Sequence, residues 1–361
     1  MTSQRFPRAF TDLVGCRYPI VQAPMAGAND WKLAAAVSAA GGLGFLPCGM
    51  LKPAEVESEV ERIRDVTDAP FGLNFFCHQR PNVDDAVIND WIDRLRPYFD
   101  EYGIDPDSVS VEDSRAPFDE AMCEMVTSLR PKVVSFHYGL PNVDLLGAVK
   151  RAGCIVLSSA TTVEEAVALE ERGVDVIIAQ GLEAGGHRGA FLEDSLERQM
   201  GLFALLPQVV DAVGVPVVAT GGIADRRGVE AAFALGACAV QLGTAFLRCP
   251  EAVISPMFRA ALEQAKSGGT QLTNVLTGGL ARGLPNRAVK ELGPISDVVP
   301  PFPFASAVIK PLRTAAEQRG RSDFTPLWAG QAVARRRALR EAGELIAQLA
   351  GERHGSESRE G

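Results

Sequence analysis

Residues 217–244, VVATGGIADRRGVEAAFALGACAVQLGT, contain two apolar runs separated by a helical stretch. Val217–Thr220 and Ala239–Leu242 are almost continuously apolar, which is typical of strands buried on both faces of a sheet. Asp225 begins the helical stretch 225–235 and can cap its N-terminus. Neighbouring parallel strands need a crossover of this kind. The stretch therefore predicts one strand–helix–strand unit of a parallel sheet.

The same pattern occurs along the preceding part of the chain. Eight alternating β/α units predict an α/β fold, a closed (β/α)₈ TIM barrel. A doubly wound open sheet is the alternative architecture. The six further predicted strands are residues 20–23, 44–47, 71–76, 133–136, 155–158 and 176–179.

Two stretches exceed a minimal barrel. The barrel domain is predicted to comprise residues 10–77 and 131–260, with a helical insertion or lid at 78–130 after the third strand. Residues 261–350 are predicted to form a C-terminal helical extension beside the barrel mouth. In residues 250–350, which follow the last predicted strand, we expect helices at 256–266 and 331–350 and an irregular segment at 267–311. Residues 351–361 are polar and are expected to form a flexible tail.

The composition excludes several functional classes. The chain has 361 residues, of which 47% are hydrophobic, and a formal net charge of −9. The single basic run, Arg335–Arg337, is expected on a solvated helix face, so a nucleic-acid partner is not predicted. Neither a membrane span nor a signal-peptide core is evident, and we expect a soluble cytoplasmic protein. The spacing of the seven cysteines and four histidines predicts neither a disulfide framework nor a metal site.

The glycines that end the last two predicted strands suggest a phosphate site. Gly221-Gly222 and Gly243-Thr244 follow strands seven and eight, where barrels commonly bind phosphate. Glycine lets backbone N–H groups approach phosphate oxygens, and Thr244 adds a hydroxyl donor. The alternative is that these glycines only form tight turns. Their position after both strands favours the phosphate site.

Amide side chains lie at three other strand ends. Asn74, Gln180 and Gln241 can each donate and accept hydrogen bonds, which is the mixture that the edge of a flavin ring requires. These amides could instead be satisfied by the backbone within the barrel.

His187 is the best candidate for a catalytic residue. It follows Gly185-Gly186 after the sixth predicted strand, and an imidazole suits proton abstraction near neutral pH. The alternative is a structural hydrogen-bonding role. His137, after the fourth strand, is a second candidate with less support.

At these motifs the sequence resembles the nitronate monooxygenase family over about residues 19–331. The two most specific blocks are Gln180-Gly-Leu-Glu-Ala-Gly-Gly-His-Arg-Gly189 and Gln241-Leu-Gly-Thr244. Similar stretches include Pro19–Gly27, Gly41–Leu46, Asn74–Phe76, Val134–Gly139, Ala281–Gly283 and Leu327–Gln331.

The resemblance implies a TIM barrel that holds FMN non-covalently. It implies that an alkyl nitronate such as propionate 3-nitronate is oxidised by O₂ to a carbonyl compound and nitrite, as a detoxification. It also implies that His187 is the base that removes the α-proton of a neutral nitroalkane. The FMN contacts implied by the motifs are Ala23, Pro24, Met25, Asn74, Gln180, Gly185, Gly186, Gly221, Gly222, Gln241, Gly243 and Thr244.

The chain departs from the family in its late segment. Some members place a tyrosine and a lysine there facing the substrate, and the nearest counterparts here are Phe302 and Lys310. With His137, these residues are the candidate substrate contacts. The sequence allows a homodimer.

Three other functions stay open at this stage. One is an NAD(P)H-dependent FMN reductase of quinones or enoyl thioesters on the same barrel. Another is a flavinless barrel lyase or isomerase that binds a phosphorylated substrate. A third is a flavin-binding protein without catalytic activity.

Overall fold

The computed structural model describes residues 6–111, 115–193, 195–334 and 339–352. Eight parallel strands form one sheet in the order β1-β9-β8-β6-β5-β4-β3-β2. The two edge strands meet, because Gln22 N donates to Leu43 O at 2.9 Å and Leu43 N donates to Ile20 O at 2.9 Å. The sheet is thus a nearly closed barrel, which confirms the TIM-barrel prediction over the open sheet. The strands are β1 Ile20–Gln22, β2 Gly44–Pro47, β3 Phe71–Phe76, β4 Val133–His137, β5 Ile155–Ala160, β6 Val176–Gln180, β8 Val217–Thr220 and β9 Ala239–Leu242.

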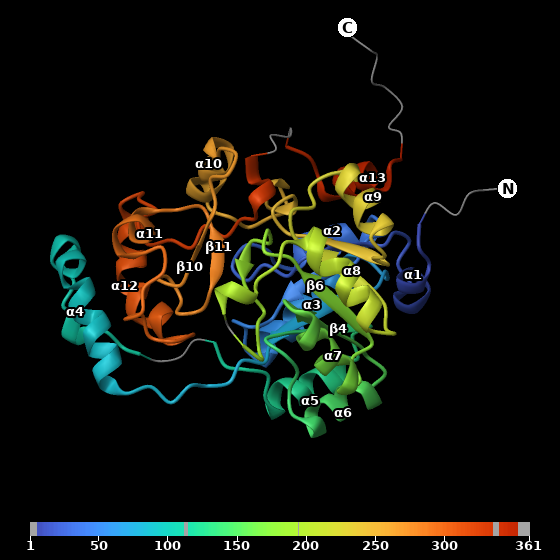
Figure 1. Ribbon diagram of the computed structural model, residues 1–361, viewed down its shortest axis with the longest axis horizontal. Coiled ribbons are helices and arrows are strands. Elements are labelled where there is room, and N and C mark those ends of the chain that lie inside the picture. Colours follow the sequence, from blue (N-terminus) through green and yellow to red (C-terminus); the bar gives the residue numbers. More distant parts are fainter. Residues whose placement is uncertain (1–5, 112–114, 194, 335–338, 353–361) are drawn as a thin grey trace, which may run out of the picture.

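Helices cover the outside of the barrel (Figure 1). Several begin at a side-chain cap, as predicted for Asp225, whose carboxylate accepts hydrogen bonds from the backbone N–H groups of Arg227 and Gly228. Their buried faces form the main core together with the outward-facing strand residues. These helices are α2 Trp31–Ala39, α3 Pro53–Val66, α5 Glu120–Leu129, α6 Val143–Arg151, α7 Val163–Glu171, α8 Leu202–Ala212, α9 Arg226–Ala234 and α13 Ala342–Ala350.

The final barrel helix is separated from its strand. α13 contacts α2, α9 and β1, and its residues Leu345, Ile346 and Leu349 belong to the main core. We expected this stretch in the extension beside the barrel mouth, whereas it closes the ring of helices. The chain between β9 and α13 is therefore a long excursion from the barrel.

A smaller core fills the inside of the barrel at the amino ends of the strands. α1 (Ala9–Val14) contributes Phe10 and Val14, which pack with inward-facing residues such as Val21, Phe45 and Val133. This end is thereby filled with apolar side chains, which leaves the carboxyl ends of the strands for a site.

The excursion and the insertion after β3 share a second core. α4 (Asp85–Tyr102) lies against α12 (Phe304–Gln318), beside the barrel (Figure 1). Trp91 and Phe99 of α4 are fully buried in the same cluster as Val308 and Leu312 of α12. The remaining short elements are η1 Pro106–Ser108, η2 Leu196–Arg198, η3 Phe246–Arg248, α10 Pro256–Gln264, α11 Arg287–Leu292 and η4 Gln331–Ala334.

A small antiparallel sheet joins the excursion to the barrel. β7 (Gly186–His187), in the loop after β6, pairs with β11 (Ala281–Gly283), which in turn pairs with β10 (Gln271–Thr273). The prediction that 267–311 is irregular is therefore wrong, since this stretch contains β10, β11, α11 and the start of α12. The two strands are only three residues long, and their pairing partner β7 is distant in the sequence.

The predicted helix at 331–350 is also only partly formed. η4 ends at Ala334 and α13 begins at Ala342. The Arg335–Arg337 run and most of the predicted tail lie outside the described residues. Among those that are described, no helix has the length and apolarity needed to cross a membrane.

Candidate active site

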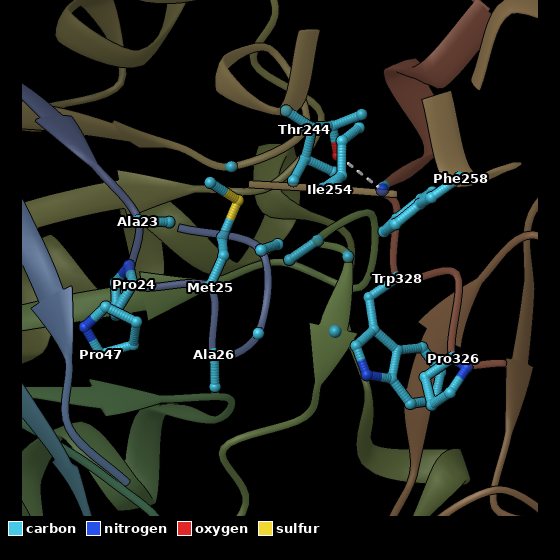
Figure 2. Close-up of a pocket in the computed structure, with 18 of the residues that line it drawn as sticks. Ala23, Pro24, Met25, Ala26, Pro47, Thr244, Ile254, Phe258, Pro326 and Trp328 are labelled. Carbon is cyan, nitrogen blue, oxygen red and sulfur yellow. Dashed lines mark hydrogen bonds between the residues drawn. The ribbon is translucent and has the colours of Figure 1, made fainter. Parts of the chain in front are cut away.

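A cavity of about 680 Å³ lies at the carboxyl ends of the barrel strands. Figure 2 shows the loop after β1, with Ala23, Pro24 and Met25, across from Pro326 and Trp328 of the excursion. The structure brings all twelve residues predicted to contact FMN into this lining, together with His137 and His187. The cavity is therefore built from the barrel and from the excursion.

The glycine loops after β8 and β9 form one part of the cavity wall. Gly221 and Gly222 have φ values of +126° and +68°, a region that side-chain-bearing residues rarely adopt. A Cβ at Gly243 would lie 3.6 Å from both Ala23 Cβ and Met25 Sδ, so a side chain there would extend into the wall. Thr244 Oγ1 accepts a hydrogen bond from Gly330 N at 2.8 Å (Figure 2). The Thr244 hydroxyl hydrogen is left to donate to a ligand.

The three strand-end amides have different surroundings. The side-chain amide of Gln180 forms two hydrogen bonds with the loop that follows it. Its Nε2 donates to His187 O at 2.9 Å, and its Oε1 accepts from Gly189 N at 2.8 Å. Asn74 Nδ2 donates to Ser135 Oγ at 2.8 Å. Gln241 Oε1 is buried and has no hydrogen-bond partner in the described chain. Gln241 thus has a buried acceptor that remains available to a ligand.

Arg188 stabilises the loop that follows β6 through hydrogen bonds of its side chain. Its buried guanidinium donates to Gly181 O at 2.7 Å, Gln180 O at 2.6 Å and Gln199 Oε1 at 2.7 Å. This side chain fixes the turn between β6 and β7 and so helps to set the position of His187.

His187 lies on β7 at the cavity wall. Its Nε2 is 2.9 Å from the Oγ1 atom of Thr277, which is fully buried. Thr277 Oγ1 also donates to Gly279 O at 3.3 Å, so the threonine oxygen is placed to accept the His187 Nε2 proton. In that arrangement Nδ1 is the unprotonated nitrogen of the ring.

The surroundings of His187 favour its neutral form. The rings of Phe302 and Trp328 lie 5.2 Å and 5.4 Å from the imidazole. Burial lowers the pKa of His187 well below 6.5, and repulsion by the charge of Arg115, and by His137 and His78 when these are protonated, lowers it further. A neutral imidazole can accept a proton at physiological pH.

His137 is held on both sides of its ring. Nδ1 lies 2.7 Å from Ser159 Oγ, and Nε2 lies 3.3 Å from His187 O. Burial lowers the pKa of His137 to about 4. Tyr138, which follows it, has a φ of +68°, so a bulky residue is held in a strained conformation beside the site.

The two candidates from the late segment lie in different places. Phe302 is buried against His187 and against His78, whose ring centroid is 4.9 Å away, although it does not itself line the cavity. Lys310 is exposed on α12 and is not part of the lining. We therefore do not retain Lys310 as a substrate contact.

Three residues near His187 were not predicted from the sequence. Arg115 and Trp328 line the cavity, and Thr277 contacts the imidazole. They come from the insertion and the excursion, whose placement over the barrel mouth is not evident from strand periodicity. Trp328 alone had a signal, because it lies in the family-like stretch Leu327–Gln331. The described residues contain no cluster of histidine, cysteine, aspartate or glutamate suited to a metal ion.

Comparisons with known proteins agree with this geometry. Residues 8–352 match a family model described as nitronate monooxygenase. Two proteins with that name, from Paraburkholderia phytofirmans and Pseudomonas aeruginosa, are each 42% identical to this chain. The alignments cover 97% and 96% of this chain and 96% and 99% of the two relatives.

Two solved structures superpose on nearly the whole length of this chain. A nitroalkane oxidase from Streptomyces ansochromogenes superposes with a TM-score of 0.87 at 40% identity, covering 95% of this chain and 97% of the other. FabK from Thermotoga maritima superposes with a TM-score of 0.72 at 27% identity, covering 96% of this chain and 95% of the other.

Proposed function

The chain belongs to the nitronate monooxygenase family, a class of flavin-dependent oxidoreductases, and we propose that it oxidises alkyl nitronates with O₂ on bound FMN. The products would be a carbonyl compound and nitrite. A small nitronate such as propionate 3-nitronate fits the proposal. The main support is the position of His187 in a cavity whose wall also carries glycine loops and an unpaired amide oxygen.

The residues present fit a flavin mononucleotide. Gln241 Oε1 offers a buried acceptor without a partner, which a ring N–H of the flavin would satisfy. Gly221, Gly222 and Gly243 lack side chains where backbone N–H groups would meet phosphate oxygens, and Thr244 adds a hydroxyl donor. Asn74 and the loop formed by Ala23, Pro24 and Met25 complete the set of residues that would hold the group. When bound, FMN supplies the electron transfer between nitronate and oxygen.

Gln180 has a positioning role in this proposal. Its amide is occupied by the backbone of His187 and Gly189, so it fixes the loop that carries the imidazole. We therefore assign it to the support of His187, in addition to the FMN contact that the motif implies.

His187 determines which form of the substrate can react. A neutral nitroalkane must lose its α-proton, and the unprotonated Nδ1 of His187 would accept it. Thr277 would hold Nε2 and so keep the ring in this tautomer. A nitronate arrives already deprotonated and does not require this step.

The aromatic side chains around His187 contribute by excluding water. Phe302 and Trp328 contact the imidazole ring, and Phe76 packs against Phe302 at 6.2 Å between centroids. Their apolar surfaces keep the imidazole neutral, and Trp328, which lines the cavity, would orient a small substrate against the opposite wall.

Cofactor analysis and product analysis test the proposal together. We expect the purified protein to be yellow, to release FMN on heating, and to form nitrite from propionate 3-nitronate only in the presence of O₂. A colourless protein that takes up no added FMN would contradict the flavin assignment. A yellow protein that forms no nitrite from any nitronate would contradict the reaction.

A further inference from the structure

Arg115 lies in the cavity wall and has no role in the chemistry described above. We propose that its guanidinium binds a carboxylate that the substrate carries at the end away from the reacting carbon. Arg115 would thus determine specificity for anionic nitronates over uncharged alkyl nitronates. The proposal rests on the proposed function and adds a binding residue to it.

The position of Arg115 connects it to the reacting end of the cavity. Its guanidinium carbon lies 5.5 Å from the centroid of the Phe302 ring, and the His187 ring lies 5.2 Å from the same centroid. Both Arg115 and His187 line the cavity. The ring of Phe302 is therefore close to both the candidate base, His187, and the half-buried Arg115. A short substrate could extend from His187 to Arg115.

The charge of Arg115 acts at this site. After burial, it is the largest cause of the lowered pKa of His187, which means that its field reaches the imidazole through the cavity wall. The same field would attract an anionic substrate. Since the whole chain carries a formal charge of −9, such attraction has to come from a local cation.

The other basic residues of the described lining are less suited to this role. Arg248 lies in η3 and Arg313 on α12, and in the described chain neither has a contact with the ring of Phe302 like that of Arg115. Arg340 lies in the segment that leads into α13. No lysine occurs among the described lining residues. Arg115 is the basic residue of this lining that approaches Phe302.

A carboxylate is the group that suits an arginine in this setting. The planar guanidinium presents paired N–H donors that match the two oxygens of a carboxylate, and it also stacks on aromatic rings. A single lysine charge would lack the paired geometry. The nitronate end of the substrate would remain beside His187.

Two substrates that differ only at the distal end test the proposal. Propionate 3-nitronate carries a carboxylate where propyl-1-nitronate carries a methyl group. In Arg115→Gln we expect kcat/KM for propionate 3-nitronate to fall about tenfold or more, mainly through KM, while propyl-1-nitronate changes less than about twofold. Arg115→Lys should recover part of the loss. Lys290→Gln, an exposed charge on α11, is the matched control and should change neither substrate.

Equal losses for both substrates in Arg115→Gln, or no loss for either, would overturn the proposal. Succinate provides a second readout, because it replaces the nitronate of propionate 3-nitronate with a carboxylate and does not react. We expect its dissociation constant, measured by calorimetry on the enzyme as isolated, to rise about tenfold in Arg115→Gln. An unchanged constant would reject the proposal even if the wild-type protein oxidised no nitronate, an outcome that would separately reject the proposed function.

Discussion

At the scale of single residues, the least expected feature is that two strand-end glutamines differ in their hydrogen-bond partners. Gln180 on β6 and Gln241 on β9 lie on strands that are separated by β8, and they have the same chemistry. Gln180 is satisfied by the loop that it supports, whereas Gln241 keeps a buried acceptor unpaired. The sequence identified both positions, because strand ends fix where side chains reach the barrel mouth. It could not assign their partners, which depend on the path of the following loop.

His187 gives the most specific prediction for a single residue. His187→Asn removes the proton acceptor and keeps a polar side chain at the cavity wall. Turnover of a neutral nitroalkane such as nitroethane should fall by about 10²–10⁴, which is the usual contribution of a positioned base. Turnover of the corresponding nitronate should change far less. Steady-state kinetics on both forms of one compound measure the difference, and equal losses would show that His187 is not the base.

His137 predicts a pH dependence of stability. Its pKa of about 4 in the folded protein lies below the usual 6.5, so the unfolded chain binds more protons between these values. The free energy of unfolding should therefore decrease as the pH falls from 6.5 towards 4. The share of His137 is at most about 3 kcal/mol, and it is fully present above pH 6.5.

Denaturant unfolding at several pH values measures this share. His137→Gln should be less sensitive to acid than the wild-type protein in the window from pH 6.5 to 4. The lost contact with Ser159 would lower the stability of the variant equally at all pH values. Parallel curves for the two proteins over this window would contradict the assignment.

At the scale of elements, the loop after β6 is held by close backbone contact with the excursion. A Cβ at Gly185 would lie 2.5 Å from Gly330 N and 2.6 Å from Ala329 C. Beside this contact, Gln331 N donates to Glu183 O at 2.9 Å, and Gly330 N donates to Thr244 Oγ1 at 2.8 Å. Thr244, to which the proposed function assigns phosphate binding, is thereby linked to the loop that precedes His187.

Gly185→Ala should disturb both features at once. The new methyl group meets backbone atoms that cannot rotate away, so the 329–331 segment has to shift, at a cost of about 1–3 kcal/mol. We also expect weaker retention of the flavin, measured as the dissociation constant of FMN from the variant. Gly214→Ala is the control, because its nearest neighbour outside the adjacent residues, Glu170 Oε1, lies at 3.5 Å. If both variants retain wild-type stability and flavin affinity, the close contact has no functional consequence.

The elements also show where sequence patterns succeed and fail. The eight strands were predicted to within two residues, because strands buried on both faces have a continuous apolar signature. The strands of the excursion were not predicted, because β11 forms by pairing with β7, which lies more than 90 residues earlier in the sequence. α13 is a further example, because its apolar face indicates burial without indicating that it returns to α2 and α9.

At the scale of the whole molecule, two cores meet at the site. The barrel contributes the strand ends and β7, and the excursion contributes Phe302, Trp328 and Thr277 around the imidazole. The second core ties the excursion to α4 through Trp91 and Leu312. We propose that the excursion residues that line the cavity set the substrate specificity, and that α4 supports them through this core. Barrel periodicity predicted the strand ends that line the cavity, whereas Thr277 follows from tertiary packing and could not be predicted from that pattern. Phe302 and Trp328 were indicated only by the resemblance to the family.

The most direct test of the proposed function is the choice of reductant in the absence of oxygen. We predict that propionate 3-nitronate added to the anaerobic enzyme bleaches the flavin absorbance near 450 nm within one turnover, at about the rate of aerobic catalysis, while NADH and NADPH cause no rapid change. Rapid bleaching by NADH or NADPH with none by the nitronate would contradict the proposal, and would indicate a reductase on the same barrel.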